Sequence, residues 1–153
     1  RRAPSSYLAR AIFDGAMSVY LDRFLNVPKA PIPPGDSGGA TDADILARFD
    51  TQQNVNETAA LVASALKDGR HEAVIRLLGR AMLREDSEFH QFQMFEAAVR
   101  QYRNFQGSEL GDHVLIGASR FLTAFSPTIR STSQTFEIAA RLNRGEALHE
   151  NEI

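Results

Sequence analysis

The sequence predicts an all-α fold: a bundle or stack of helical hairpins with six to seven helices, preceded by an N-terminal helical arm on a linker rich in Pro and Gly. Apolar side chains recur at every third or fourth position from Tyr7 onward, which is the spacing of amphipathic helices. No stretch shows the sustained alternation of apolar and polar residues that a half-buried strand requires. Four of the six prolines lie within residues 27–40, and this segment is the candidate boundary in the chain.

Length and composition indicate a soluble globular protein. The 153 residues are 43% hydrophobic and carry a formal net charge of −2, which suits a single core. No apolar run approaches the roughly 20 residues of a membrane span. The absence of Cys excludes a disulfide framework, Cys-ligated zinc and a thiol nucleophile. The near-neutral charge and a pI of about 6.1 argue against nucleic acid as a partner. We expect a cytoplasmic chain, although the lack of Cys fits an exported bacterial protein equally well.

The first predicted helix covers residues 6–26. Ser5 or Ser6 can cap it, and Val27 before Pro28 ends it, because a residue that precedes proline disfavours the α region. Nearly the whole circumference is apolar or small. Such a helix is either enclosed by other helices or held at an interface, so residues 1–26 are interpreted as an arm.

Residues 27–40 (VPKAPIPPGDSGGA) are predicted to form a linker. Its prolines favour an extended path, and Gly35, Gly38 and Gly39 favour a mobile one. The string GDSGG at residues 35–39 also surrounds the nucleophile of chymotrypsin-like proteases. That chemistry needs a rigid scaffold, which in those proteases is a β-barrel, and no strands are predicted here, so a connector is the preferred interpretation.

The helical domain is expected at residues 41–145, followed by an acidic tail at 146–153. Thr41 and Asp44 have the spacing of a capping pair, and the polar stretch TQQNVNE breaks the helix that follows them. Ile45, Leu46 and Phe49 give one short apolar face. Two hairpins are expected at about 57–84, with Gly69 ending the first helix, and at about 87–125. Each helix of the first hairpin carries an apolar stripe: Leu61, Val62, Ala65 and Leu66, followed by Val74, Leu77, Leu78 and Ala81. Asp86 and Ser87 are candidate residues for starting the second hairpin. Ser126-Pro127 predicts the start of the last helix, since serine caps and proline suits the first helical position.

An aromatic stripe runs along the second hairpin. Helical spacing makes core packing the preferred role, and lining a cofactor pocket is the alternative. The stripe contains Phe89, Phe92, Phe95, Tyr102 and Phe105.

Two short motifs match enzyme signatures only in part. Ser64 and Lys67 form an SxxK string like that of β-lactamases, but the companion SDN and KTG strings are absent. His71-Glu72 opens like a zinc-protease helix, yet position 75 is Ile. Both matches are interpreted as chance.

The acidic and imidazole side chains give the metal or cofactor hypothesis its candidates. These are His71, His90, His113, Glu88 and Glu96. Glu88 and His90 point about 200° apart on a helix and cannot chelate together. A structural role is preferred for His90 and His113, because a bundle easily orients a single neutral imidazole.

A basic ridge is predicted from Arg76, Arg80 and Arg84, which are spaced i, i+4, i+8. Such a ridge is able to bind an anion or an acidic partner. The plainer interpretation is a solvated helix face, with Glu72 and Glu88 as its neighbours.

Two functional hypotheses follow. The preferred one is a non-catalytic interaction or assembly module, a subunit or fragment of a larger protein or complex. In it the first helix binds a protein partner or a second copy through Tyr7, Tyr20 and Phe24. The alternative is a helical metal- or cofactor-binding domain of a redox enzyme. No set of reactive groups identifies a substrate or an enzymatic activity.

Overall fold

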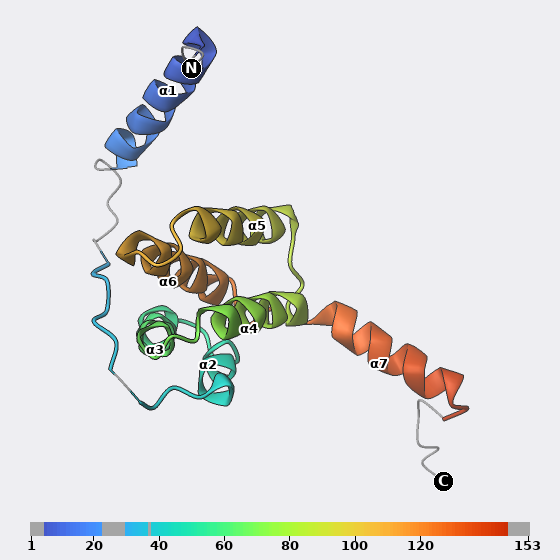
Figure 1. Cartoon of the computed structure of the whole chain (residues 1–153). Coiled ribbons are helices and arrows are strands. Elements are labelled where there is room, and N and C mark those ends of the chain that lie inside the picture. Colours follow the sequence, from blue (N-terminus) through green and yellow to red (C-terminus); the bar gives the residue numbers. More distant parts are fainter. Residues whose placement is uncertain (1–4, 23–29, 37, 147–153) are drawn as a thin grey trace. The chain divides into compact units, whose positions relative to one another are not determined.

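The computed structural model describes residues 5–22, 30–36 and 38–146. These residues form seven α-helices and no strand (Figure 1), which confirms the all-α prediction. The chain divides into two compact units, residues 1–31 and 32–153. The helices are α1 (Ser6–Asp22), α2 (Asp42–Arg48), α3 (Val55–Lys67), α4 (His71–Arg84), α5 (Phe89–Asn104), α6 (Glu109–Ala124) and α7 (Ser131–Asn143).

Helix α1 is the helix described in the first unit. The backbone N–H of Leu8 donates to Ser5 Oγ over 3.3 Å, so Ser5 acts as the predicted cap. Residues 23–26 of the predicted helix, and its end at Val27-Pro28, lie outside the described residues.

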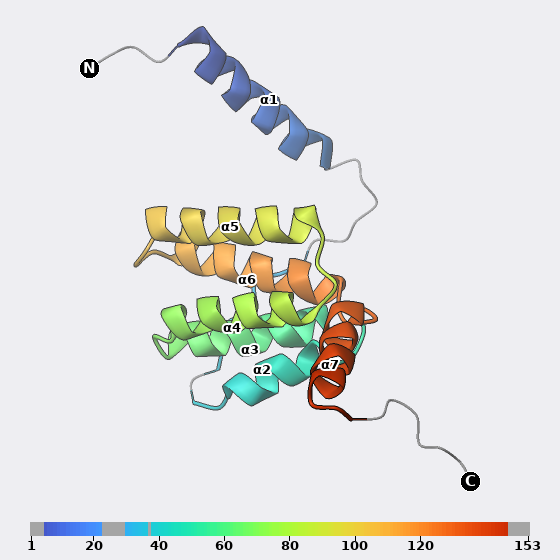
Figure 2. The ribbon, with the colours of Figure 1, turned by 90° about the vertical axis from the view of Figure 1, so that its right-hand side faces the viewer.

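The second unit is built from two helical hairpins, α3–α4 and α5–α6. Helix α6 packs against α3, α4 and α5, while α2 packs against α3 and α4. Figure 2 shows these five helices stacked, with α5 at one edge of the stack and α2 at the other. The arrangement follows from the apolar faces of α3, α4 and α6, because these faces are buried against one another.

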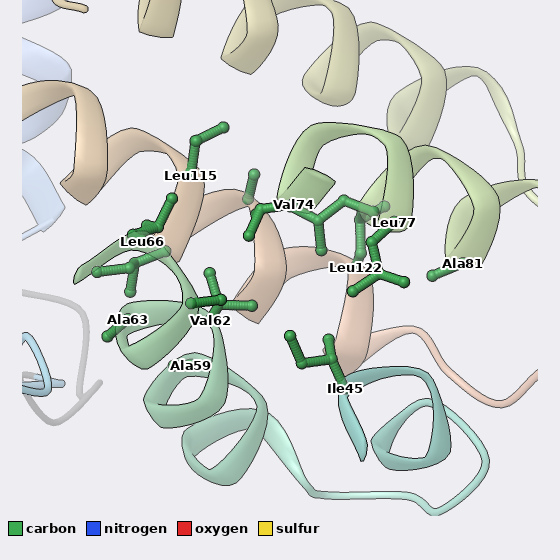
Figure 3. Close-up of a cluster of buried hydrophobic side chains, with 14 of the residues drawn as sticks. Ile45, Ala59, Val62, Ala63, Leu66, Val74, Leu77, Ala81, Leu115 and Leu122 are labelled. Atoms are coloured by element: carbon green, nitrogen blue, oxygen red, sulfur yellow. The ribbon is translucent and has the colours of Figure 1, made fainter. Parts of the chain in front are cut away.

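The core lies among α2, α3, α4 and α6 (Figure 3). The predicted stripe of Val74, Leu77, Leu78 and Ala81 is entirely buried. Ile45 and Phe49, expected on one short apolar face, are also fully buried. Each large apolar side chain contributes about 1.5–3 kcal/mol when it is removed from water, so these stripes hold the second unit together.

Local signals place several helix ends correctly. Thr41 and Asp44 form the predicted capping box at the start of α2. Gly69 follows α3 with a φ of +76°, which suits glycine. The residues between Phe49 and Asn54 form turns that separate α2 from α3.

The core prediction for the aromatic stripe is wrong at three of its five positions. Phe89, Phe92 and Phe105 are exposed, whereas Tyr102 is buried and Phe95 is half-buried. Helix α5 lies at the edge of the stack and packs mainly on α6, so only a narrow face is covered.

The predicted start of the last helix is also wrong. Ser126 closes α6, because its Oγ donates to the carbonyl of Leu122 over 2.9 Å. Helix α7 begins at Ser131, after Arg130 in the left-handed region. Its N-terminal amides bind Asp86, which lies far away in sequence. Asp86 therefore does not start α5; Glu88 does so, in a capping box with Gln91.

Among the described residues, no helix is both long enough and apolar enough to cross a bilayer.

Candidate interaction surfaces

The side chains of α1 are exposed along its described length. Most of its large apolar residues share about half of the circumference at the roughly 100° per residue of an α-helix, and Leu21 lies outside that half. That half includes Leu8, Ile12, Phe13, Met17, Val19 and Tyr20. The opposite side carries Arg10 and Asp14, which form an i, i+4 ion pair at 3.7 Å. An apolar face this wide is typical of a helix that is buried by other elements.

The three anchors predicted on the first helix have different positions. Tyr7 is 83% exposed and Tyr20 is 48% exposed. The two lie roughly 140° apart around the helix, and Tyr7 falls on the polar side beside Asp14. Phe24 lies outside the described residues. Of the three predicted anchors, Tyr20 is therefore the one that the structure describes on the main apolar face of α1.

The linker residues of the second unit are docked on α3. Gly35 has a φ of +66° and lies so close to the backbone of Ala63 that a Cβ atom would sit 2.8 Å from the carbonyl oxygen. The N–H of Asp36 donates to Ser64 Oγ at 2.9 Å, and Lys67 Nζ donates to the carbonyl of Gly35 at 3.1 Å. This part of the linker therefore follows a specific path, in contrast to the mobile path expected from its glycines.

These contacts explain the two enzyme-like strings together. The serine and lysine of the SxxK string bind the backbone of Gly35 and Asp36, the first two residues of the GDSGG string. The partners of Ser64 Oγ are backbone groups, since it also donates to the carbonyl of Ala60. Both strings serve to dock the linker.

The predicted metal-ligand candidates lie in different surroundings. Nε2 of His71 lies 2.9 Å from Asp112 Oδ1, and the imidazole stacks on buried Tyr102 with ring centroids 5.8 Å apart. His90 is exposed and contacts the ring of Phe89 edge-on. Within the described ranges, no three His, Asp or Glu side chains are placed to hold one metal ion.

The other candidates are exposed as well. His113 lines a shallow pocket with Lys67 and Glu109. Glu88 caps α5, and Glu96 pairs with Arg100 at 2.8 Å.

The arginine ridge is divided by the tertiary structure. Arg76 and Arg80 are exposed on α4, beside Asp42. Arg84 instead pairs with Asp50 at 2.8 Å and donates to the carbonyl of Leu46. This arginine thus links the end of α4 to α2.

A buried ionic junction lies where α4, α6 and α7 meet. The side chain of Glu85 is only 4% exposed. It accepts hydrogen bonds from Arg130 at 2.7 and 3.0 Å, and from the N–H and hydroxyl of Thr128 at 2.7 and 2.9 Å. Burial opposes ionisation of Glu85, yet the hydrogen bonds from Arg130 and Thr128 hold its pKa below the usual range. Arg130 also binds Asp50 at 2.6 Å.

Asp86 completes this junction. Its carboxylate accepts from the N–H of Ser131 at 2.8 Å and from the N–H of Thr132 at 3.1 Å. These two backbone hydrogen bonds lower the pKa of Asp86. Sequence reasoning missed the junction, because the hydrogen-bond donors to Glu85 and Asp86 lie more than forty positions later in the chain.

An apolar groove between α5 and α6 was also missed. Its floor and walls are formed by Met94, Ala97, Phe121 and Phe125, with Glu88, His90, Gln91 and Gln93 along the α5 side. The rings of Phe121 and Phe125 contact each other with centroids 4.9 Å apart. Near it, α7 contains no buried residue. The second unit therefore exposes an apolar groove and, on α7, the apolar side chains of Phe136, Ile138 and Leu142.

Comparison of the chain with models of known protein families, with curated proteins and with solved structures found no match. The functional argument therefore depends on the geometry described above.

Proposed function

We propose that this chain is a non-catalytic helical interaction module, and that α1 is the helix by which it binds another protein chain. The observation that carries the proposal is the apolar face of α1. Phe13 is 73% exposed and Val19 is 70% exposed, although both residue types are usually buried. A contiguous apolar surface of this kind is a mark of a protein–protein contact.

The chemistry of the described side chains supports an assembly role. The pair of His71 with Asp112 joins α4 to α6, and its imidazole stacks on the core residue Tyr102. Ser64 binds backbone groups. The charged groups with several partners, Glu85 and Arg130, join segments of the fold. The alternative, a metal- or cofactor-binding domain, has no comparable cluster to support it among residues 5–22, 30–36 and 38–146.

Sedimentation equilibrium of the full chain at micromolar concentration tests this proposal. We expect an assembled species. Ile12→Asp places a charge in the middle of the apolar face and should raise the dissociation constant at least tenfold, because the carboxylate would have to be desolvated. Ser18→Asp adds the same charge on the polar side of α1 and should leave assembly unchanged.

Two results would overturn the proposal. One is a wild-type chain that remains monomeric at that concentration. The other is an assembly whose dissociation constant is the same for Ile12→Asp as for Ser18→Asp.

A further inference from the structure

We propose that α7 of one copy of this chain occupies the α5–α6 groove of a second copy, and that the exchange is reciprocal across a two-fold axis. The proposal concerns a surface separate from α1, and it stands or falls independently of the function proposed above.

The first argument is the amphipathic character of α7. Phe136, Ile138 and Leu142 are exposed on an arc of about 200° at 100° per residue. The same arc also holds Ala139 and Ala140 and the polar residues Ser131, Thr132, Thr135 and Asn143. Glu137 and Arg141 lie on the opposite side, at the roughly 100° per residue of an α-helix. A helix of 13 residues with no buried side chain is marginal by itself in water. We therefore expect another surface to cover the apolar side chains of α7 and stabilise the helix.

The second argument is the position of the groove. Gln91 and Phe125 line the α5–α6 groove and also line the small pocket over Glu85, Asp86 and Thr128, from which α7 departs. The groove and the start of α7 are therefore adjacent on the surface. A two-fold axis through this region brings each helix onto the other copy's groove in a closed, isologous contact.

The third argument excludes the chain's own α7 as the occupant. Asp86 binds the first two amides of α7, and Glu85 holds Arg130 and Thr128 immediately before them. These bonds fix the direction of α7 relative to the end of α4, and in this position α7 has no buried residue. The residues that line the α5–α6 groove include none of the same chain's α7, and docking on a second copy keeps the bonds of the junction in place.

The fourth argument is the area available. Each copy contributes the exposed parts of Ile129, Phe136, Ile138 and Leu142 and of the groove side chains. At about 150–250 Å² for each buried aromatic side chain and somewhat less for each aliphatic one, this is on the order of 800 Å² per copy, which is the size of a standard stable interface.

Cysteine cross-linking of the full chain tests the proposal directly, because the natural sequence contains no Cys. The double variant Ala97→Cys/Ala139→Cys places one thiol in the groove and one in the apolar arc of α7; both alanines are exposed. On mild oxidation we expect a disulfide-linked dimer on a non-reducing gel that disappears on reduction. Each single variant should remain mostly monomeric.

Three results would overturn the proposal: an intrachain disulfide in a monomer, no disulfide at all, or equal amounts of dimer from the single and double variants. The same cross-link should persist when Ile12→Asp is added, which separates this contact from any made by α1.

Point variants provide an independent measurement by sedimentation. Ala97→Glu leaves α7 intact and should raise the dimer dissociation constant at least tenfold, because it places a charge in the groove. Phe136→Asp should also raise the dimer dissociation constant, because it places a charge on the apolar arc of α7. Gln134→Glu, on the polar side of α7, is the matched control and should not change it. An unchanged constant in Ala97→Glu contradicts the proposal even if Phe136→Asp unfolds the helix.

Discussion

At Gly35 the backbone passes so close to α3 that no side chain fits. A Cβ atom there would lie 2.8 Å from both the carbonyl carbon and the carbonyl oxygen of Ala63, and the φ of +66° is one that L residues rarely adopt. The sequence shows a glycine-rich linker but not which glycine is required. Only the contact with Ala63 distinguishes Gly35 from Gly38, whose own φ is +80° but which has open space around it.

A pair of alanine substitutions separates these two effects. We expect Gly38→Ala to lower the free energy of unfolding by about 1 kcal/mol, the cost of a left-handed L residue. Gly35→Ala should cost roughly 1–3 kcal/mol more, because the backbone of α3 must also shift. Chemical denaturation of both variants measures the difference. Equal losses would show that the linker is not docked on α3.

At the scale of elements, helix ends follow local signals where the capping residues are neighbours in sequence. Thr41 and Asp44 are three positions apart, and their capping box was predictable. The start of α7 could not be predicted from local sequence, because its capping carboxylate comes from Asp86, 45 positions before Ser131. The local signal at Ser126-Pro127 is used instead to end α6. Local capping preferences therefore predict the end of a helix correctly only when no residue distant in the sequence caps that helix instead.

Asp86→Ala should selectively weaken α7. The variant removes the acceptor for the amides of Ser131 and Thr132, and α7 has no buried side chain to compensate. We expect the amide protons of the first turn of α7 to lose their protection in hydrogen exchange followed by NMR. Those of α3 should keep their protection. Unchanged exchange in α7 would contradict the assigned cap.

At the scale of the whole molecule, one ionic junction joins segments that are far apart in the chain. Arg130 binds Glu85 at the end of α4 and Asp50 just after α2. Because Glu85 is buried, its charge must be matched by these partners. The stability of the second unit should therefore depend on the ionisation of this single carboxyl group.

Measuring the free energy of unfolding as a function of pH tests the role of Glu85 ionisation. The pKa of Glu85 is lower in the folded protein than its ordinary value of 4.5, so folding favours the ionised form. The stabilisation is complete above pH 4.5 and is lost as the pH falls through the folded pKa. Glu85→Gln should lower the free energy of unfolding by about 3 kcal/mol at neutral pH.

The difference between wild type and Glu85→Gln should shrink as the solution is acidified below pH 4.5. Glu57→Gln, at an exposed position on α3, is the control and should follow the wild-type profile. Parallel profiles for wild type and Glu85→Gln would contradict this role for the junction.

The sequence by itself determined the helical class, the stripes of α3 and α4 and the caps made by near neighbours. Each of these depends on residues within one or two turns of one another, where the period of 3.6 residues and local hydrogen bonds decide the outcome. For the same reason Val74, Leu77 and Leu78 were identified as core residues.

Only the tertiary structure decided which apolar faces are covered. Phe89 and Phe92 repeat at helical spacing as the core residues do, yet they are exposed because α5 lies at the edge of the stack. The junction of Glu85 with Arg130 and the docking of Gly35 on Ala63 likewise join residues that are distant in the chain. Periodicity shows that a helix has an apolar face, but burial depends on which other elements pack against that face in space.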